Sequence, residues 1–175
     1  MNSKYVLIFI LVFVLAIFVG CSKASDDAEQ MTKVFLTQFY NFDYEKSDEI
    51  LKPLKSGEIL KQDYLDSVYN EFKPLMTDEA LKTLLANRTY FRNILFCSNN
   101  NCSLKIKQLD LNKTFYDKKE RKIGFNYVAS IEIIYENGKR KEVEEEKGYV
   151  GLIETNDKWK VYSNIITSMS KEFFM

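Results

Sequence analysis

The most informative absence in this sequence of 175 residues is histidine, which does not occur at all. Histidine is the side chain used most often for acid–base catalysis near neutral pH, so such chemistry here would rest on carboxylates and tyrosines. The chain also has no serine–histidine or cysteine–histidine arrangement, no phosphate-binding glycine loop and no cluster with metal-ligand spacing. We therefore expect no catalytic activity, no cofactor and no bound metal.

Net charge is the second absence, because 25 Lys and Arg side chains balance 25 Asp and Glu side chains. A protein that binds nucleic acid through its phosphates needs a basic face, so nucleic acid is not an expected partner. The sequence also has no internal repeat, no low-complexity run and no second linker. This organisation predicts one folded domain with a sizeable core.

The long apolar run stands at the start of the chain. Residues 5–20 carry no charge, and Lys4 is the only charged side chain before them. A weakly basic start followed by about 16 apolar residues is typical of a signal peptide and falls short of the roughly 20 residues that a spanning helix prefers. Gly20 then provides the small side chain that a signal peptidase needs at its cleavage site, and Cys21 follows it directly.

The stretch FVGC that ends this run resembles the lipobox of bacterial lipoproteins. The resemblance implies that residues 1–20 are a signal peptide cleaved between Gly20 and Cys21, and that Cys21 carries diacylglycerol and palmitate-type acyl chains. Residues 21–27 would then be a lipidated tether, and residues 28–175 a single domain on the outer side of a cell membrane or outer membrane. An uncleaved membrane anchor and an ordinary secretory signal stay open as alternatives. All three place the domain outside the cytoplasm.

If Cys21 carries lipid, two cysteines remain, Cys97 and Cys102. An even pair in an oxidising compartment predicts a disulfide, which would staple the CSNNNC stretch at a junction between a helix and a strand. Free thiols stay open as the alternative. Metal chelation is weakly indicated, because two thiols with four residues between them have no third soft ligand.

Three helices are expected in the first half of the domain. Apolar residues recur every three or four positions over 28–42 and again over 58–72. Pro74 ends the second helix, since proline has no backbone donor and disfavours helical geometry in the residue before it. Thr77 is expected to cap a third helix that runs to about Tyr90. The first helix is expected to bury Met31, Val34, Phe35, Phe39 and Phe42.

The second half alternates between apolar and polar residues, which is typical of strands. Four strands are expected, at 104–111, 123–135, 141–154 and 159–165. The alternation changes phase near Lys107 and Gln108, which indicates a bulge. Asn137-Gly138 predicts a hairpin turn, because both residues tolerate positive φ. The longest strand is expected to bury Ile123, Phe125, Tyr127, Ala129, Ile131, Ile133 and Tyr135.

These elements predict an α+β domain in which about three helices pack on a curved four-stranded antiparallel sheet. The order, with the ending GYVGLIETNDKWKVYSN, resembles the NTF2-like (cystatin-like α+β cone) domains of small bacterial envelope lipoproteins. The matching residues are 148–153 and 159–161. The resemblance implies a non-catalytic binding or scaffolding lipoprotein of unknown ligand. The helices-first arrangement also resembles the periplasmic domains of conjugation-machinery scaffolds, so a component of an envelope-spanning assembly is the alternative.

Some NTF2-like relatives, such as ketosteroid isomerases and scytalone dehydratases, are enzymes that line the cone with Asp, His and Tyr. The resemblance therefore keeps an isomerase- or dehydratase-like enzyme as a further alternative. Tyr127, Tyr135 and Trp159 are the candidate pocket residues, although their alternation with apolar residues favours core packing. An enzyme would show a carboxylate deep in the cone beside a tyrosine hydroxyl, whereas a scaffold would show an exposed apolar patch outside it.

Two further stretches carry predictions about partners. The run KRKEVEEEK, residues 139–147, mixes charges and predicts a solvated hairpin, with a partner-docking edge as the alternative. Phe173 and Phe174 are expected to pack into the domain rather than to mark an interface. The expected partners are thus a membrane, reached through the lipid anchor, and either an envelope protein or a small apolar ligand.

Overall fold

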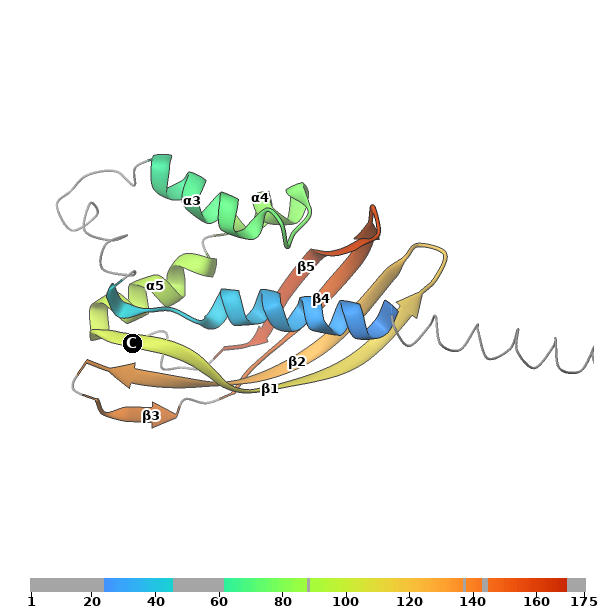
Figure 1. The fold of residues 1–175 in the computed structure, drawn as a ribbon. Coiled ribbons are helices and arrows are strands. Elements are labelled where there is room, and N and C mark those ends of the chain that lie inside the picture. Colours follow the sequence, from blue (N-terminus) through green and yellow to red (C-terminus); the bar gives the residue numbers. More distant parts are fainter. Residues whose placement is uncertain (1–23, 46–61, 88, 137, 143–144, 170–175) are drawn as a thin grey trace, which may run out of the picture.

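A curved antiparallel sheet with helices packed along one side forms the body of the protein in the computed structural model (Figure 1). The structure describes residues 24–45, 62–87, 89–136, 138–142 and 145–169. The predictions for the signal peptide, for Gly20 and Cys21, and for Phe173 and Phe174 lie outside these residues. Within the described ranges, no helix has both the length and the apolar composition needed to cross a bilayer.

The helices of the described ranges are residues 24–40, α3 (Gln62–Phe72), α4 (Asp78–Ala86) and α5 (Thr89–Asn100). Thr77 caps α4 as predicted, because its hydroxyl accepts a hydrogen bond from the Ala80 amide at 3.3 Å. The predicted end near Tyr90 is wrong, since α4 stops at Ala86 and α5 follows. The α5 sequence has few strong helix formers, and burial of its aromatic and aliphatic side chains stabilises the helix instead.

The 24–40 helix differs from its prediction at both its start and its buried face. Residues 24–27 are already helical and Ala24 packs against the core, so the helix begins four residues before its predicted start. Val34 is 41% exposed, although it was expected to be buried. The face that meets the core instead carries Ala28, Phe35 and Phe39, all of them fully buried, and Val34 lies to one side of it.

The strands are β1 (Cys102–Asp117), β2 (Lys122–Tyr135), β3 (Arg140–Glu142), β4 (Glu146–Thr155) and β5 (Lys158–Ser168). The order β1-β2-β4-β5 confirms the predicted α+β fold with a four-stranded antiparallel meander, and the pairing of β1 with β2 shifts between Ile106 and Gln108, where the bulge was expected. The single return strand predicted over 141–154 is wrong. It is divided into β3 and β4, which pair with different parts of β2.

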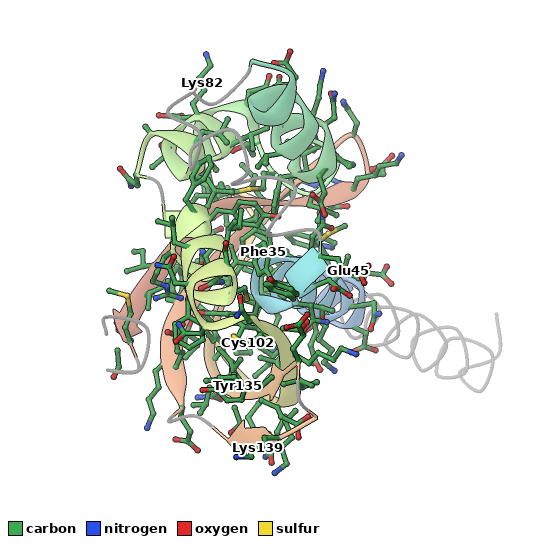
Figure 2. The ribbon with its side chains drawn as sticks, turned by 90° about the vertical axis from the view of Figure 1, so that its left-hand side faces the viewer. Phe35, Glu45, Lys82, Cys102, Tyr135 and Lys139 are labelled. Atoms are coloured by element: carbon green, nitrogen blue, oxygen red, sulfur yellow. The ribbon has the colours of Figure 1, made fainter. Side chains whose placement is uncertain are left out.

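The core lies between the helices and the inner face of the sheet. The predicted inner residues of β2 are no more than 1% exposed from Ile123 to Ile133, and Tyr135 is partly buried. Aromatic rings from the helices fill the other side, with the Tyr90 ring centroid 4.9 Å from that of Phe72 and 5.0 Å from that of Phe42. Figure 2 shows Phe35 inside this layer. These contacts hold the helices on the sheet.

Short extended segments cover part of each outer strand. Phe42 forms an antiparallel bridge with Leu104 on β1. On β5, the Val161 amide donates to the Leu75 carbonyl at 2.8 Å, and the Thr77 amide donates to the Val161 carbonyl at 2.9 Å. Beyond Val161, the outer edge of β5 pairs with no other strand of the described residues. This uncovered part of β5 forms one wall of a groove.

Candidate functional site

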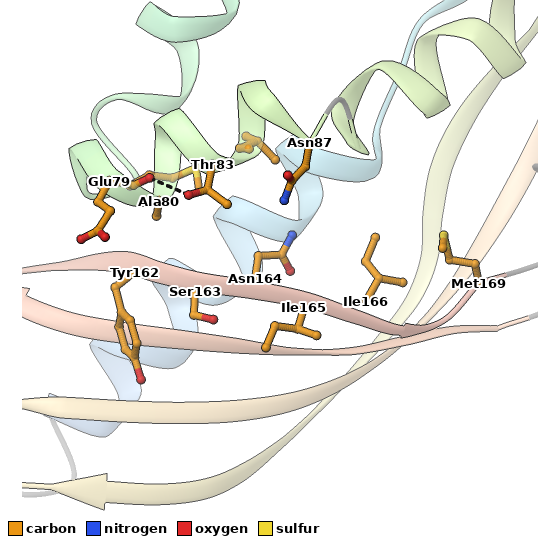
Figure 3. Close-up of a pocket in the computed structure, with 12 residues that line it drawn as sticks. Glu79, Ala80, Thr83, Asn87, Tyr162, Ser163, Asn164, Ile165, Ile166 and Met169 are labelled. Atoms are coloured by element: carbon orange, nitrogen blue, oxygen red, sulfur yellow. Dashed lines mark hydrogen bonds between the residues drawn. The ribbon is translucent and has the colours of Figure 1, made fainter.

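The groove opens between α4 and the second half of β5 (Figure 3) and has a volume of about 510 Å³. Ala80, Thr83 and Leu84 of α4 line one wall, and Asn164 and Ile166 of β5 point toward them from the other. Ile165 and Met169, at the rim, are 53% and 41% exposed. Large apolar side chains that remain this exposed beside a concavity are typical of a binding surface.

One polar atom inside the groove lacks a partner. The Asn164 Oδ1 atom is buried and accepts no hydrogen bond from any residue that the structure describes. A buried acceptor without a donor costs free energy, and a ligand with an N–H or O–H group would remove that cost. Glu79 is the only charged side chain among the described lining residues. The groove therefore suits a ligand or segment that has apolar groups and offers a hydrogen-bond donor to Asn164.

A buried polar network forms a second candidate site, deep between α5, β2 and β4. The Glu146 side chain is fully buried, and Arg92 Nη2 donates to its Oε2 at 3.0 Å. Arg92 also donates to Asn93 Oδ1, at 3.1 Å from Nε and 2.9 Å from Nη2, and Asn93 Nδ2 donates to the Phe39 carbonyl at 3.0 Å. The Glu146 Oε1 atom has no hydrogen bond of ordinary geometry within the described part of the chain.

Two tyrosines extend this network. The Tyr40 and Tyr127 hydroxyls lie 2.8 Å apart and share a hydrogen bond. Burial raises the pKa of Tyr127 to about 12, partly opposed by the hydrogen bond with Tyr40. Burial, followed by the charges of Tyr127 and Glu146, raises the pKa of Tyr40 even further above its ordinary value. Both hydroxyls are therefore protonated at neutral pH and serve as hydrogen-bonding groups rather than as bases.

The three predicted pocket residues lie in different places. Tyr127 belongs to the buried network, and Tyr135 lies at the far end of β2, opposite Cys102 (Figure 2). Trp159 lines a second cavity of about 410 Å³ beside Met31 and Pro74. Tyr127 and Tyr135 line neither the α4–β5 groove nor this second cavity. The chain thus brings Tyr127 together with Tyr40 and Glu146 instead of with Trp159.

Glu146 and Arg92 are the site residues that sequence reasoning missed. Glu146 belongs to the charged run 139–147, for which a solvated hairpin was predicted, and the prediction is wrong at this residue. The alternation of β4 places Glu146 on the same inner face as Val150 and Leu152. If the alternation of β4 is continued from Val150 back into the charged run, it predicts that Glu146 faces the core.

The two remaining cysteines are neighbours and both fully buried. Cys97 lies on α5 and Cys102 begins β1, so the stretch expected to be a loop is helical as far as Asn100. No disulfide joins Cys97 and Cys102 in this structure. A hydrogen bond with Cys97 lowers the pKa of the Cys102 thiol, against the opposing effect of burial. The described residues contain no group of three or more side chains able to hold a metal ion.

We expect these two thiols to form a disulfide in an oxidising compartment, which would stabilise the domain by roughly 2 kcal/mol because the closed loop is small. Intact mass measured after alkylation, with and without prior reduction, tests this. A bridged protein takes up two alkyl groups only after reduction. The Cys97→Ser variant is the control, since its remaining thiol cannot pair within the domain. Equal alkylation of the wild-type protein under both conditions would mean that no bridge forms.

No protein-family model matches the chain, and no curated protein is similar to it in sequence. Among solved structures, a periplasmic fragment of TraM superposes with a TM-score of 0.53 at 10% identity, over 83% of this chain and 98% of the fragment. The intermembrane space region of the chloroplast protein ARC6 gives 0.37 at 8% identity, over 73% and 98%. Aln2 from a Streptomyces species gives 0.41 at 10% identity, over 77% and 88%. The chain therefore shares its fold with the TraM fragment.

Proposed function

We propose that this protein is a lipid-anchored, extracytoplasmic lipoprotein with an NTF2-like domain that binds a partner in the α4–β5 groove without catalysing a reaction. The apolar leader that ends at Cys21 supports the anchor and the location. The exposed Ile165 and Met169 beside the groove support the binding role and are the observation on which it rests. A fold shared with a periplasmic fragment is compatible with this location.

The occupant of the groove is, in this proposal, an envelope protein or a small apolar ligand. A groove with one wall on an outer strand and one on a helix leaves backbone groups of β5 available to an extended segment. The unpaired Asn164 acceptor adds one specific contact to a surface lined by both apolar and polar side chains. If the occupant is a component of an envelope-spanning assembly, such as conjugation machinery, this protein has a role within that assembly.

An isomerase- or dehydratase-like enzyme is the second candidate, and the buried Glu146 beside Tyr40 and Tyr127 is the observation that favours it. Two features argue for a structural role of this network. Arg92 already pairs with the carboxylate, and Glu146 lines neither the α4–β5 groove nor the second cavity. A general base must reach its substrate, so a sealed carboxylate supports the binding proposal better.

Photo-crosslinking in intact cells tests the groove. A photoreactive residue in place of the exposed Thr83 should capture one discrete adduct. Ile165→Glu should reduce that adduct to background, because it places a charge at the apolar rim. Val34→Glu is the matched control, since Val34 is 41% exposed on the 24–40 helix and does not line the groove. An adduct that persists in Ile165→Glu, or that is lost equally in Val34→Glu, would refute the groove as the binding site.

A further inference from the structure

Three segments that are far apart in the sequence lie together at one end of the molecule (Figure 1). Lys113 Nζ donates to Ser25 Oγ at 3.3 Å, which joins β1 to the start of the 24–40 helix. Arg121, in the β1–β2 turn, donates to Glu154 at 3.0 Å and to Asp157 in the β4–β5 turn at 3.2 Å. We call this end the turn surface. It consists of residues 24–27, 117–122 and 155–158.

The second cavity shows that the helix start also meets the β4–β5 turn. Ala24 and Asp27 line it from the helix, and Asp157 and Lys158 line it from the turn. Ala24 packs against the core as well. The helix start is therefore attached to the body of the domain and cannot swing away from it independently. Any constraint on residue 24 becomes a constraint on the orientation of the whole domain.

We propose that the turn surface faces the bilayer and touches its headgroup region, an inference that rests on the proposed lipid anchor at Cys21. Residue 24 follows Cys21 by three positions, and three residues span at most about 11 Å when fully extended. Acyl chains on Cys21 hold its sulfur at the membrane surface. The start of the helix is thereby kept within that reach of Cys21, and both hairpin turns lie at the same end of the domain (Figure 1).

Charge does not drive this contact, because the exposed charges of the turn surface have both signs. Acidic and basic side chains are present in equal number within it: Asp26, Asp27, Asp117, Lys118, Lys119, Glu120, Arg121, Lys122, Asp157 and Lys158. A polybasic surface would require anionic lipids, whereas this one does not. The length of the tether sets the orientation, so a neutral phosphatidylcholine bilayer is sufficient.

The orientation turns the opposite end of the molecule away from the membrane. The 14 residues of β2 separate the two ends by roughly 45 Å, at about 3.3 Å per residue. Lys139 lies in the turn beyond β2, at the distal end (Figures 1 and 2). Asn164, Ile165 and Ile166, which line the groove, lie in the half of β5 farther from the β4–β5 turn. A partner that occupies it therefore approaches from the aqueous side.

Spin labels at two exposed lysines test the orientation in the lipidated full-length protein. Lys119→Cys places a nitroxide on the turn surface, and Lys139→Cys places one at the distal end, in phosphatidylcholine vesicles that contain a nickel-chelating lipid. We expect the lipid-bound nickel to enhance relaxation several-fold more at position 119 than at position 139. Protein without the added cysteines, treated with the same reagent, is the blank for the buried thiols.

Equal enhancement at the two positions, or greater enhancement at 139, overturns the orientation. A difference that appears only after anionic lipid is added also overturns it, because charge rather than tether length would then set the contact. Intact mass separates this failure from failure of the anchor. If the intact mass shows no lipid on Cys21, both the proposed anchor and the proposed orientation are refuted. If the protein is lipidated but the relaxation enhancement does not favour position 119, only the orientation is refuted, and the proposal of binding in the groove is unaffected.

Discussion

Replacing Cys21 with alanine should abolish incorporation of labelled palmitate into this protein completely. The thiol of Cys21 is the atom to which the proposed diacylglycerol is attached, and alanine has no atom that can take its place. Each buried methylene of an acyl chain contributes roughly 0.8 kcal/mol to membrane binding, so the lost chains account for nearly all of the anchoring free energy. The measurement is metabolic labelling followed by isolation of the protein, together with the intact mass of the wild-type chain.

Cys97→Ser and Cys102→Ser are the matched controls, because each removes a thiol that is buried in the domain. Both should keep the label. The wild-type mass should correspond to a lipidated chain that begins at Cys21. Label in Cys21→Ala would contradict the lipid site, and a wild-type chain that retains residues 1–20 would favour the uncleaved anchor. Unprocessed protein in the cytosol would remove the extracytoplasmic role altogether.

Replacing Glu146 with alanine should lower the free energy of unfolding by about 3 kcal/mol. The Glu146 carboxylate is fully buried, and its loss removes the acidic group that lies 3.0 Å from the Arg92 guanidinium, whose side chain is only 13% exposed. An uncompensated charge in a low-dielectric region is costly, and the new cavity adds to the loss. Denaturant unfolding monitored by circular dichroism measures the change.

Glu145→Ala is the matched control. Glu145 is the adjacent residue, its side chain is 54% exposed, and it pairs with Lys147 at 3.4 Å. Breaking an exposed ion pair of this kind should change the free energy of unfolding by less than about 1 kcal/mol. The double variant Arg92→Met and Glu146→Leu should recover much of the stability, because no buried charge is then left unpaired. Equal effects of Glu146→Ala and Glu145→Ala would show that the buried pair does not stabilise the fold.

Local patterns in the sequence predicted most of the architecture. The alternation over 123–135 identified the inner face of β2, the change of phase near Lys107 located the bulge, and Thr77 marked the start of α4. Each of these signals depends on side-chain periodicity or on capping within a few residues of chain, so it can be read before any tertiary contact forms.

The elements that were missed have weak local signals. The α5 sequence contains three aromatic residues, three asparagines and one cysteine, none of which favours a helix intrinsically. It is helical because residues such as Tyr90 and Ile94 are buried against other elements. The division of the predicted return strand into β3 and β4 likewise depends on pairing with two separate parts of β2.

The sequence by itself determined the apolar run before Cys21, the absence of histidine and the α+β order of the elements, since these follow from composition and short-range periodicity. Tertiary structure alone decided which polar side chains are buried and which groups they contact. Glu146 stands in a charged run, yet it is buried beside Arg92, which comes 54 residues earlier, and Asn164 is left without a donor inside a groove. The burial and the hydrogen-bond partners of a side chain depend on residues that are distant in the sequence but close in the fold, and a local sequence pattern contains no information about them.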